Sequence, residues 1–410
     1  MIKETSHKQY LRAFAINTPI VLCLVVAINF LVDPYGIYHF VNIKGFNANK
    51  PSIQSHLRMT KAYQVKRQQP RAIILGTSRA EFGLDPDHPG FIHRPTYNLN
   101  LSGGNMYEML RYFQHADSVS QIDQVVLALD FFQFDINSEN RADFDERRLA
   151  TDVRGDVENT WFAPRDLIDS LLTLDALSAS LNTVVRQFQK PIYLKNGSID
   201  PSATVRGKLI HIIGQRNLFI MNEKRYFSKT YEGFHLTSNN GFSTSLGNYR
   251  MLISLAYANG IDLKLLINPS HARQLETLAV KGLWPTFESW KTQLVEINEE
   301  EAVAADKAPF LIWDFSGYSS YTTEPVPRAG DIKTKMAWYW ESSHFTKELG
   351  NLVLDKVLAS NPKQDRGEVP FGMVLTSNNI EVYLQNVRGR RDAWRSANPS
   401  DVKEIEMLLD

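Results

Sequence analysis

The 410-residue chain has almost no cysteine and no net charge, and each of these absences excludes a kind of site or partner. Its only cysteine is Cys23, which excludes a disulfide within the chain and a metal site built from cysteines. The 45 basic and 45 acidic residues cancel, so nothing indicates a nucleic-acid partner. The sequence also lacks a cluster of metal-ligating residues and a phosphate-cradling loop, and we therefore expect no metal or other cofactor.

One long apolar run lies near the N-terminus. Residues 14–32 contain only three polar side chains, and a helix of this length crosses roughly 30 Å of hydrocarbon. Basic residues precede the run with little acidic opposition, which favours a cytoplasmic N-terminus and translocation of the rest: Lys3, Lys8 and Arg12.

A cleaved signal peptide and a buried helix of a soluble protein are the alternatives for this run. Residues 26–30 make a poor cleavage site, and the basic flank disfavours a buried helix. We therefore expect an uncleaved anchor over residues 1–33 and a soluble region over residues 34–410.

Short apolar runs alternate with helical patterns through much of the soluble region, which is typical of a parallel sheet. Strands are expected at 71–76, 95–101, 124–129, 262–267 and 310–315, and helices at 106–117, at 246–259, through Trp290 and from Thr346 to about Leu358. Residues 137–245 interrupt this alternation, and we interpret them as an insertion that caps or borders the crevice. A C-terminal extension is expected from about residue 361.

The strand at 71–76 ends on a serine that can act as a nucleophile. Gly76 allows a tight turn there, and ligands of open α/β sheets bind just beyond the carboxyl ends of the strands. Glu341 and His344 lie far downstream, three residues apart, and can supply a base for Ser78 and a carboxylate that orients the base. The competing interpretations are a helix cap for Ser78 and a structural role for His344.

A serine nucleophile also needs donors for the oxyanion that forms during acyl transfer. Ser78 can offer its own backbone N–H at the start of a helix. Gly103 and Gly104 follow the next strand and offer further N–H groups, and Asn105 adds a side-chain amide.

These motifs resemble those of the SGNH/GDSL hydrolase superfamily. Residues 76–79, Gly-Thr-Ser-Arg, match the first family block with threonine in place of aspartate. Residues 98–104 resemble the second block, and residues 341–344, Glu-Ser-Ser-His, resemble the terminal block with glutamate in place of aspartate. The resemblance implies a three-layer α/β/α fold, flavodoxin-like, with a mostly parallel sheet and a Ser78–His344–Glu341 triad.

The sequence is most similar to membrane-anchored bacterial members of that superfamily, many of which accompany acylation of surface polysaccharide or cell wall. This resemblance implies a single-pass protein of the bacterial inner membrane with its soluble region in the periplasm or outside the cell. It also implies a polysaccharide or another acylated surface glycan as partner, and a multipass membrane protein as acyl donor.

The third family block departs from the pattern. It normally ends in an asparagine that donates to the oxyanion, whereas this chain has Asp130, which cannot donate when ionised. Asn105 is then the first candidate for the missing donor. Arg79 and His271 are candidates for substrate contacts in the crevice, although Arg79 can equally form a buried ion pair with Asp130.

Three functions remain open from the sequence. The first is a membrane-anchored serine esterase or O-acyltransferase that acts on an exported or surface polysaccharide through an acyl-serine intermediate. The second is a non-catalytic carbohydrate-binding or assembly subunit that keeps the same scaffold. The third is a lipid or thioester hydrolase, for which the insertion at 137–245 would supply an apolar groove.

Overall fold

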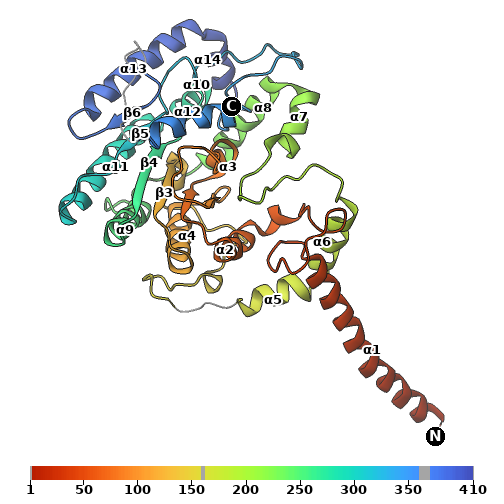
Figure 1. Ribbon diagram of the computed structural model, residues 1–410. Coiled ribbons are helices and arrows are strands. Elements are labelled where there is room, and N and C mark those ends of the chain that lie inside the picture. Colours follow the sequence, from red (N-terminus) through yellow and green to blue (C-terminus); the bar gives the residue numbers. More distant parts are fainter. Residues whose placement is uncertain (1, 158–161, 360–369, 410) are drawn as a thin grey trace. The chain divides into compact units, whose positions relative to one another are not determined.

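A computed structural model describes residues 2–157, 162–359 and 370–409 of the chain (Figure 1). The chain forms two compact units. Unit 1 comprises residues 1–67 and 143–193, and unit 2 comprises residues 68–142 and 194–410. These boundaries differ from an anchor followed by one soluble region, because the segment expected as one insertion, 137–245, is shared between the units.

Unit 2 is built on a six-stranded sheet with the order β2-β1-β3-β4-β5-β6. The first five strands are parallel and β6 runs antiparallel to β5. The strands are β1 (Ala72–Leu75), β2 (Thr96–Asn98), β3 (Gln124–Leu129), β4 (Asp262–Ile267), β5 (Ile312–Asp314) and β6 (Met373–Leu375). The expected α/β class with a mostly parallel sheet is therefore confirmed.

Along the chain, the helices of unit 2 lie between the strands of the sheet or after the last strand. They are α3 (Ser78–Gly83), α4 (Met106–Val119), α7 (Val205–Ile213), α8 (Gln215–Arg225), α9 (Thr244–Ala258), α10 (Ala272–Val280), α11 (Trp284–Ala304), α12 (Lys347–Val357), α13 (Ile380–Ala397) and α14 (Pro399–Glu406). The single long helix expected through Trp290 is wrong. The chain breaks at Gly282, and α11 starts anew with Pro285 in its first turn, where proline needs no backbone donor.

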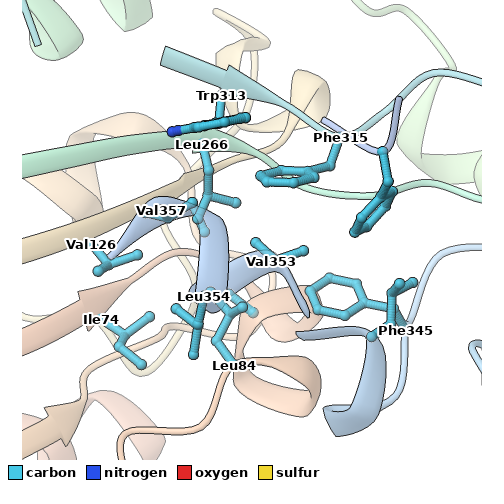
Figure 2. Close-up of a cluster of buried hydrophobic side chains, with 14 of the residues drawn as sticks. Ile74, Leu84, Val126, Leu266, Trp313, Phe315, Phe345, Val353, Leu354 and Val357 are labelled. Atoms are coloured by element: carbon cyan, nitrogen blue, oxygen red, sulfur yellow. The ribbon is translucent and has the colours of Figure 1, made fainter. Parts of the chain in front are cut away.

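One face of the sheet is covered by α12 (Figure 2). Three side chains from neighbouring strands of the sheet are fully buried there against Val353 and Leu354 of this helix: Ile74, Val126 and Leu266. Alternate residues of a strand point to the same face, so these side chains form one continuous apolar layer. This layer fixes the start of α12, and with it the segment before the helix, against the sheet.

The C-terminal extension is an integral part of unit 2. Its β6 continues the sheet, and α14 is joined to α10 by buried charges. Arg273 on α10 is fully buried, pairs with Glu223 on α8 at 2.7 Å and contacts Asp401 on α14 at 2.8 Å. The expected start of the extension falls within residues 360–369, outside the described residues.

Unit 1 contains α1 (Ile2–Val32), α2 (Leu57–Gln68), α5 (Pro164–Leu171) and α6 (Leu174–Val185). Residues His7–Val32 of α1 form a helix long and apolar enough to cross a membrane, and only 11% of its most apolar window is buried. Such exposure distinguishes α1 from the core helix of a soluble protein, which would be mostly buried. A single N-terminal helix of this kind is consistent with the expected anchor.

Candidate active site

The turn after β1 presents Ser78 at the first position of α3. Thr77 is the N-cap of this helix, and its hydroxyl accepts a hydrogen bond from Arg79 N–H at 3.3 Å. Ser78 is therefore not needed as the cap and its hydroxyl can face outward. Gly76 is required because a Cβ there would lie 2.8 Å from the carbonyl oxygen of Ala128 and 2.9 Å from Asn100 Oδ1.

Close packing of α3 on α12 brings Ser78 and His344 together. A Cβ on Gly350 would lie 1.8 Å from the carbonyl oxygen of Gly83, and a Cβ on Gly83 would lie 1.9 Å from the Phe345 ring, so the helices can meet at this distance only because both residues are glycines. Ser78 starts α3, and His344 lies three residues before the first residue of α12. The glycine contact therefore sets the separation of Ser78 and His344.

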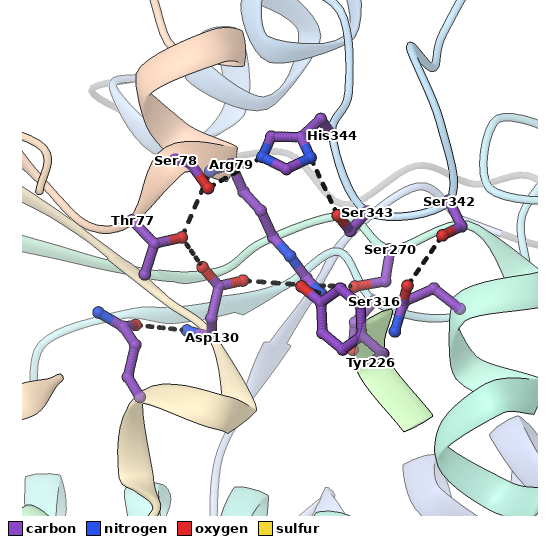
Figure 3. Close-up of polar contacts among 12 residues, drawn as sticks. Thr77, Ser78, Arg79, Asp130, Tyr226, Ser270, Ser316, Ser342, Ser343 and His344 are labelled. Carbon is purple, nitrogen blue, oxygen red and sulfur yellow. Dashed lines mark hydrogen bonds and ion pairs between the residues drawn. The ribbon is translucent and has the colours of Figure 1, made fainter. Parts of the chain in front are cut away.

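The structure places Ser78 and Glu341 on opposite sides of the His344 ring, each within hydrogen-bonding reach of it. Figure 3 shows the contact of Ser78 with His344. Ser78 Oγ lies 2.9 Å from His344 Nε2, and Glu341 Oε1 contacts the opposite ring nitrogen, Nδ1. The turn between Glu341 and His344 is closed by the hydrogen bond from Trp340 N–H to the carbonyl oxygen of His344, at 2.9 Å. That turn directs both side chains to the same side.

Two serines between Glu341 and His344 hold the carboxylate. Ser343 donates to Glu341 through its backbone N–H at 3.0 Å and through its hydroxyl at 3.2 Å. Ser342 donates its hydroxyl to Gln274 Oε1 at 2.9 Å. The amide of Asn222 reaches the hydroxyls of Ser342 and Ser343 at 2.9 and 3.1 Å. Hydrogen bonds from Ser343 thus fix the carboxylate, and α8 and α10 hold the two serines in place.

Arg206 is a member of the cluster that the sequence did not suggest. It lies on α7, its Nη1 is 3.5 Å from Glu341 Oε1, and its guanidinium lies over the Phe82 ring at 5.4 Å. The Phe82 ring also contacts the His344 imidazole, with 4.7 Å between ring centroids. Arg206 lies in a segment without a recognisable motif and far from the other members, so only the folded chain reveals it.

Burial and charge shift the pKa values of His344 and Glu341. Burial lowers the pKa of His344 below its usual value, the positive charge of Arg206 lowers it further, and Glu341 opposes both effects. Burial alone would raise the pKa of Glu341, but His344, Arg206 and the Ser343 N–H outweigh it, so that the pKa falls. At neutral pH the site therefore contains a carboxylate and a neutral imidazole that can accept a proton from Ser78.

Arg79 does not face the crevice as expected of a substrate contact. It is 5% exposed, and its Nη1 lies 3.1 Å from Asp130 Oδ1 and 2.9 Å from Ser270 Oγ. Asp130 also accepts a hydrogen bond from Thr77 Oγ1 at 2.5 Å (Figure 3). Of the two roles left open for Arg79, the structure shows the buried ion pair, because a buried guanidinium needs a counter-charge.

Asn105 does not serve as the substitute oxyanion donor in this structure. Its side-chain oxygen caps α4 by accepting from Glu108 N–H at 2.9 Å. Its amide group donates to the carbonyl oxygen of Ser138 and to Asn140 Oδ1, both at 3.0 Å. The expectation was wrong because the cap holds the side chain in place while its amide is donated to Ser138 and Asn140.

The two glycines before Asn105 differ in what they can offer. Gly104 N–H donates to the carbonyl oxygen of Leu101 at 2.9 Å and is therefore engaged in a turn. Gly103 has a positive φ of 64°, and its carbonyl oxygen accepts from Arg141 Nε at 2.9 Å. Within the described ranges, no acceptor lies opposite the Gly103 N–H, which leaves this group as the better donor of the two.

His271 is a structural residue and not a crevice contact. It is 2% exposed and caps α10, where its Nδ1 accepts from Arg273 N–H at 3.2 Å. Its Nε2 donates to the carbonyl oxygen of Glu324 at 2.7 Å. Both ring nitrogens are therefore occupied, so neither is available to a substrate.

No family model, no curated protein and no solved structure matches this chain. A search for three or more clustered His, Cys, Asp or Glu side chains that could hold a metal ion finds none in residues 2–157, 162–359 and 370–409. The geometry and chemistry of the Ser78 cluster are therefore what indicate a function.

Proposed function

We propose that this chain is a membrane-anchored serine esterase or O-acyltransferase of the SGNH/GDSL type, with an exported or surface polysaccharide as its substrate. The observation that carries the proposal is the contact of Ser78 Oγ with His344 Nε2 at 2.9 Å, with Glu341 on the other ring nitrogen. Nucleophile, base and orienting carboxylate in this order are the parts that acyl transfer through serine requires.

Acylation begins with His344 Nε2 taking the proton of Ser78 Oγ as the oxygen attacks the acyl carbonyl. The same nitrogen then gives that proton to the departing alkoxide, and Ser78 carries the acyl group. Water or a sugar hydroxyl attacks the acyl-serine in the second half. His344 accepts the proton of the attacking group and gives it to Ser78 Oγ as the acyl–serine bond breaks. Water as acceptor gives an esterase, and a sugar hydroxyl gives a transferase. Glu341 stabilises the imidazolium in both halves.

The oxyanion requires donors near Ser78. The backbone N–H of Ser78 is one candidate, because the first N–H groups of a helix have no acceptor within the helix. The Gly103 N–H is the second. Asp130 replaces the family's third-block asparagine and is tied to Arg79 and Thr77, so it supplies no donor. We therefore propose a hole formed by main-chain N–H groups.

The membrane anchor and the family resemblance support the rest of the proposal. A helix such as α1 would hold the enzyme where exported glycans emerge. We propose an inner-membrane location in a bacterium, a soluble region outside the cytoplasm with the three-layer arrangement of that family, and a multipass membrane protein as acyl donor.

The test is labelling of the full-length protein in detergent by a fluorophosphonate probe. We expect labelling of the native chain and its loss in Ser78→Ala and His344→Ala. Ser343→Ala is the matched control, because its hydroxyl lies 3.0 Å from His344 Nδ1 without being the proposed nucleophile, and this variant should still be labelled. Absence of labelling in a folded native chain would contradict the proposal.

A second candidate function follows from the incomplete oxyanion hole. Asp130 replaces the asparagine that donates to the oxyanion in the family, and the amide of Asn105 is engaged in other hydrogen bonds. Such a site would suit a non-catalytic polysaccharide-binding or assembly subunit. In that case the fluorophosphonate would not react, while the native chain and Ser78→Ala would bind polysaccharide equally well.

A further inference from the structure

We call helix α6 of unit 1 inverted, because its apolar residues are exposed and its buried residues are small or polar. Its buried side carries small or polar residues: Ala176, Ala179, Ser180 and Thr183. Its apolar residues face outward, and Leu174 is 81% exposed and Val185 is 80% exposed. Phe188, just beyond the helix, is 91% exposed. A surface helix in water normally shows the opposite distribution.

Helix α5 repeats the inversion. Its buried residues are Asp166 and Ser170, whereas Ile168 and Leu172 are exposed. The buried polar groups are satisfied, because Asp166 accepts from the Tyr63 hydroxyl at 2.7 Å and Ser170 is bonded to the Tyr38 hydroxyl at 2.6 Å. Small or hydrogen-bonded polar residues on the buried side and apolar residues on the exposed side are the arrangement expected for helices that face lipid.

Both inverted helices are bonded to the C-terminal end of α1. The amide of Asn29 donates to the carbonyl oxygen of Leu171 at the end of α5, at 2.9 Å. Its side-chain oxygen accepts from Ser180 Oγ on α6, at 2.8 Å. Asn29 is buried, although the preceding turns of α1 are largely exposed. In Figure 1, α5 and α6 adjoin the end of α1 that is farther from the N-terminus.

The length of α1 places this end near a membrane surface. The 26 residues His7–Val32 span about 39 Å, against roughly 30 Å for the hydrocarbon core of a bilayer. The last turns of α1 therefore reach the headgroup region. The inverted helices are bonded to those turns, so their exposed apolar residues lie at the depth where interfacial helices bind.

Basic residues border this apolar surface. Phe188 lies next to the loop after α1, since a Cβ on Gly45 would be 3.9 Å from its ring. Lys44 precedes that glycine and Arg186 precedes Phe188, and both are exposed. Arg186 is held by its carbonyl oxygen, which accepts from the Asn49 amide at 3.2 Å. Cations around an apolar surface favour anionic lipid headgroups.

We propose that α5 and α6 lie in the bilayer interface and contact lipid directly, so that the protein binds the membrane through an interfacial surface in addition to α1. This lipid-contacting surface consists of Ile168, Leu172, Leu174, Leu181, Val185 and Phe188. Lys44 and Arg186 contact the headgroups of anionic lipids. The proposal requires that α1 spans the bilayer, which belongs to the proposed function, and it does not depend on the chemistry at Ser78.

The test measures collision of spin labels with two reagents in the full-length protein, reconstituted into vesicles of phosphatidylethanolamine and phosphatidylglycerol. Oxygen concentrates in lipid, and nickel ethylenediamine diacetate remains in water. Single labels are placed by Leu181→Cys and Val185→Cys in a Cys23→Ser background. Ile20→Cys, on the exposed surface of α1, is the lipid control, and Ser396→Cys, on the exposed side of α13, is the water control.

We expect labels at positions 181 and 185 to collide readily with oxygen and to lose access to the nickel reagent, as at position 20. Free access to the nickel reagent, as at position 396, would overturn the proposal. Shielding from both reagents would also overturn it, because a second copy of the chain would then cover the surface. A water-like result at position 20 would reveal a failed anchor, and fluorophosphonate labelling reports separately on Ser78.

Discussion

Two buried carboxylates lie near the Ser78 turn in unit 2, each beside an arginine, and their pKa values shift in opposite directions. Asp130 lies 3.1 Å from Arg79, and Glu341 lies 3.5 Å from Arg206. Burial raises the pKa of Asp130, and Arg79 and Thr77 only partly offset this effect. The pKa of Glu341 falls despite complete burial.

The difference between the two carboxylates lies in their other partners. Glu341 faces an imidazole that can take up a proton and accepts from the N–H of Ser343, whereas Asp130 faces only groups with fixed protonation states. A low pKa keeps Glu341 charged while His344 gains and loses a proton. We therefore propose that the Glu341 cluster takes part in the chemistry and that the Asp130 cluster supports the structure, and each proposal can be tested.

Glu341→Gln should cause the largest loss of rate. A glutamine at this position cannot stabilise the imidazolium and favours the wrong tautomer of His344, so reaction with a fluorophosphonate should slow on the order of 10⁴-fold. The measurement is the second-order rate constant of labelling in the folded full-length protein. Ser343→Ala removes a neighbouring donor and leaves the charge in place, so its loss should be far smaller. Equal losses in the two variants would contradict the assignment.

Asp130→Asn should affect stability and leave the chemistry nearly intact. It leaves Arg79 buried without a counter-charge, which should lower the free energy of unfolding by about 3–5 kcal/mol. Chemical unfolding of the full-length protein in detergent measures this change, and the labelling rate below the transition should remain within tenfold of the native rate. The double variant Arg79→Met, Asp130→Asn removes both charges and should recover part of the loss. Strictly additive losses would mean that the ion pair is not the cause.

Arg206→Gln should alter the pH profile. The Arg206 charge lowers the pKa of His344, so its removal should raise that pKa toward its usual value. His344 acts as a base only when neutral, so activity is lost as pH falls through this pKa. The acid limb of the labelling rate should therefore move to higher pH in Arg206→Gln and stay in place in Arg206→Lys, which retains the charge. An unchanged limb in Arg206→Gln would separate Arg206 from the base.

The sequence predicted the sheet well because short apolar strands carry a strong local signal. The runs at 124–129 and 262–267 became β3 and β4 with the same boundaries. The helix expected through Trp290 was wrong because helical periodicity alone does not reveal the break at Gly282. The two units could not be predicted either, since they join segments that are distant in the sequence, such as residues 1–67 and 143–193.

Sequence reasoning singled out Ser78, His344 and Glu341 because their residue types and spacing suit acyl transfer, and the structure places His344 in contact with both of the others. It missed Arg206 and the contact of Gly83 with Gly350, because neither has a local pattern and both depend on how α3, α7 and α12 pack. It assigned Asn105 to the crevice because a polar side chain after a strand suggests a ligand. The helix expected at 106–117 already put Asn105 at a helix terminus, but the contacts of its amide with Ser138 and Asn140 depend on the folded chain.

Asn105→Ala should cause the smallest change and separates capping from catalysis. Loss of an N-cap oxygen costs about 1 kcal/mol of stability, whereas loss of an oxyanion donor costs roughly 10²-fold or more in rate. We expect the stability loss with a labelling rate within about twofold of native, because the amide hydrogens of Asn105 are already donated to Ser138 and Asn140. Asn105→Ser keeps a capping oxygen without an amide and should recover most of the stability. A large loss of rate in both variants would return Asn105 to the oxyanion hole and make its present hydrogen bonds a resting arrangement.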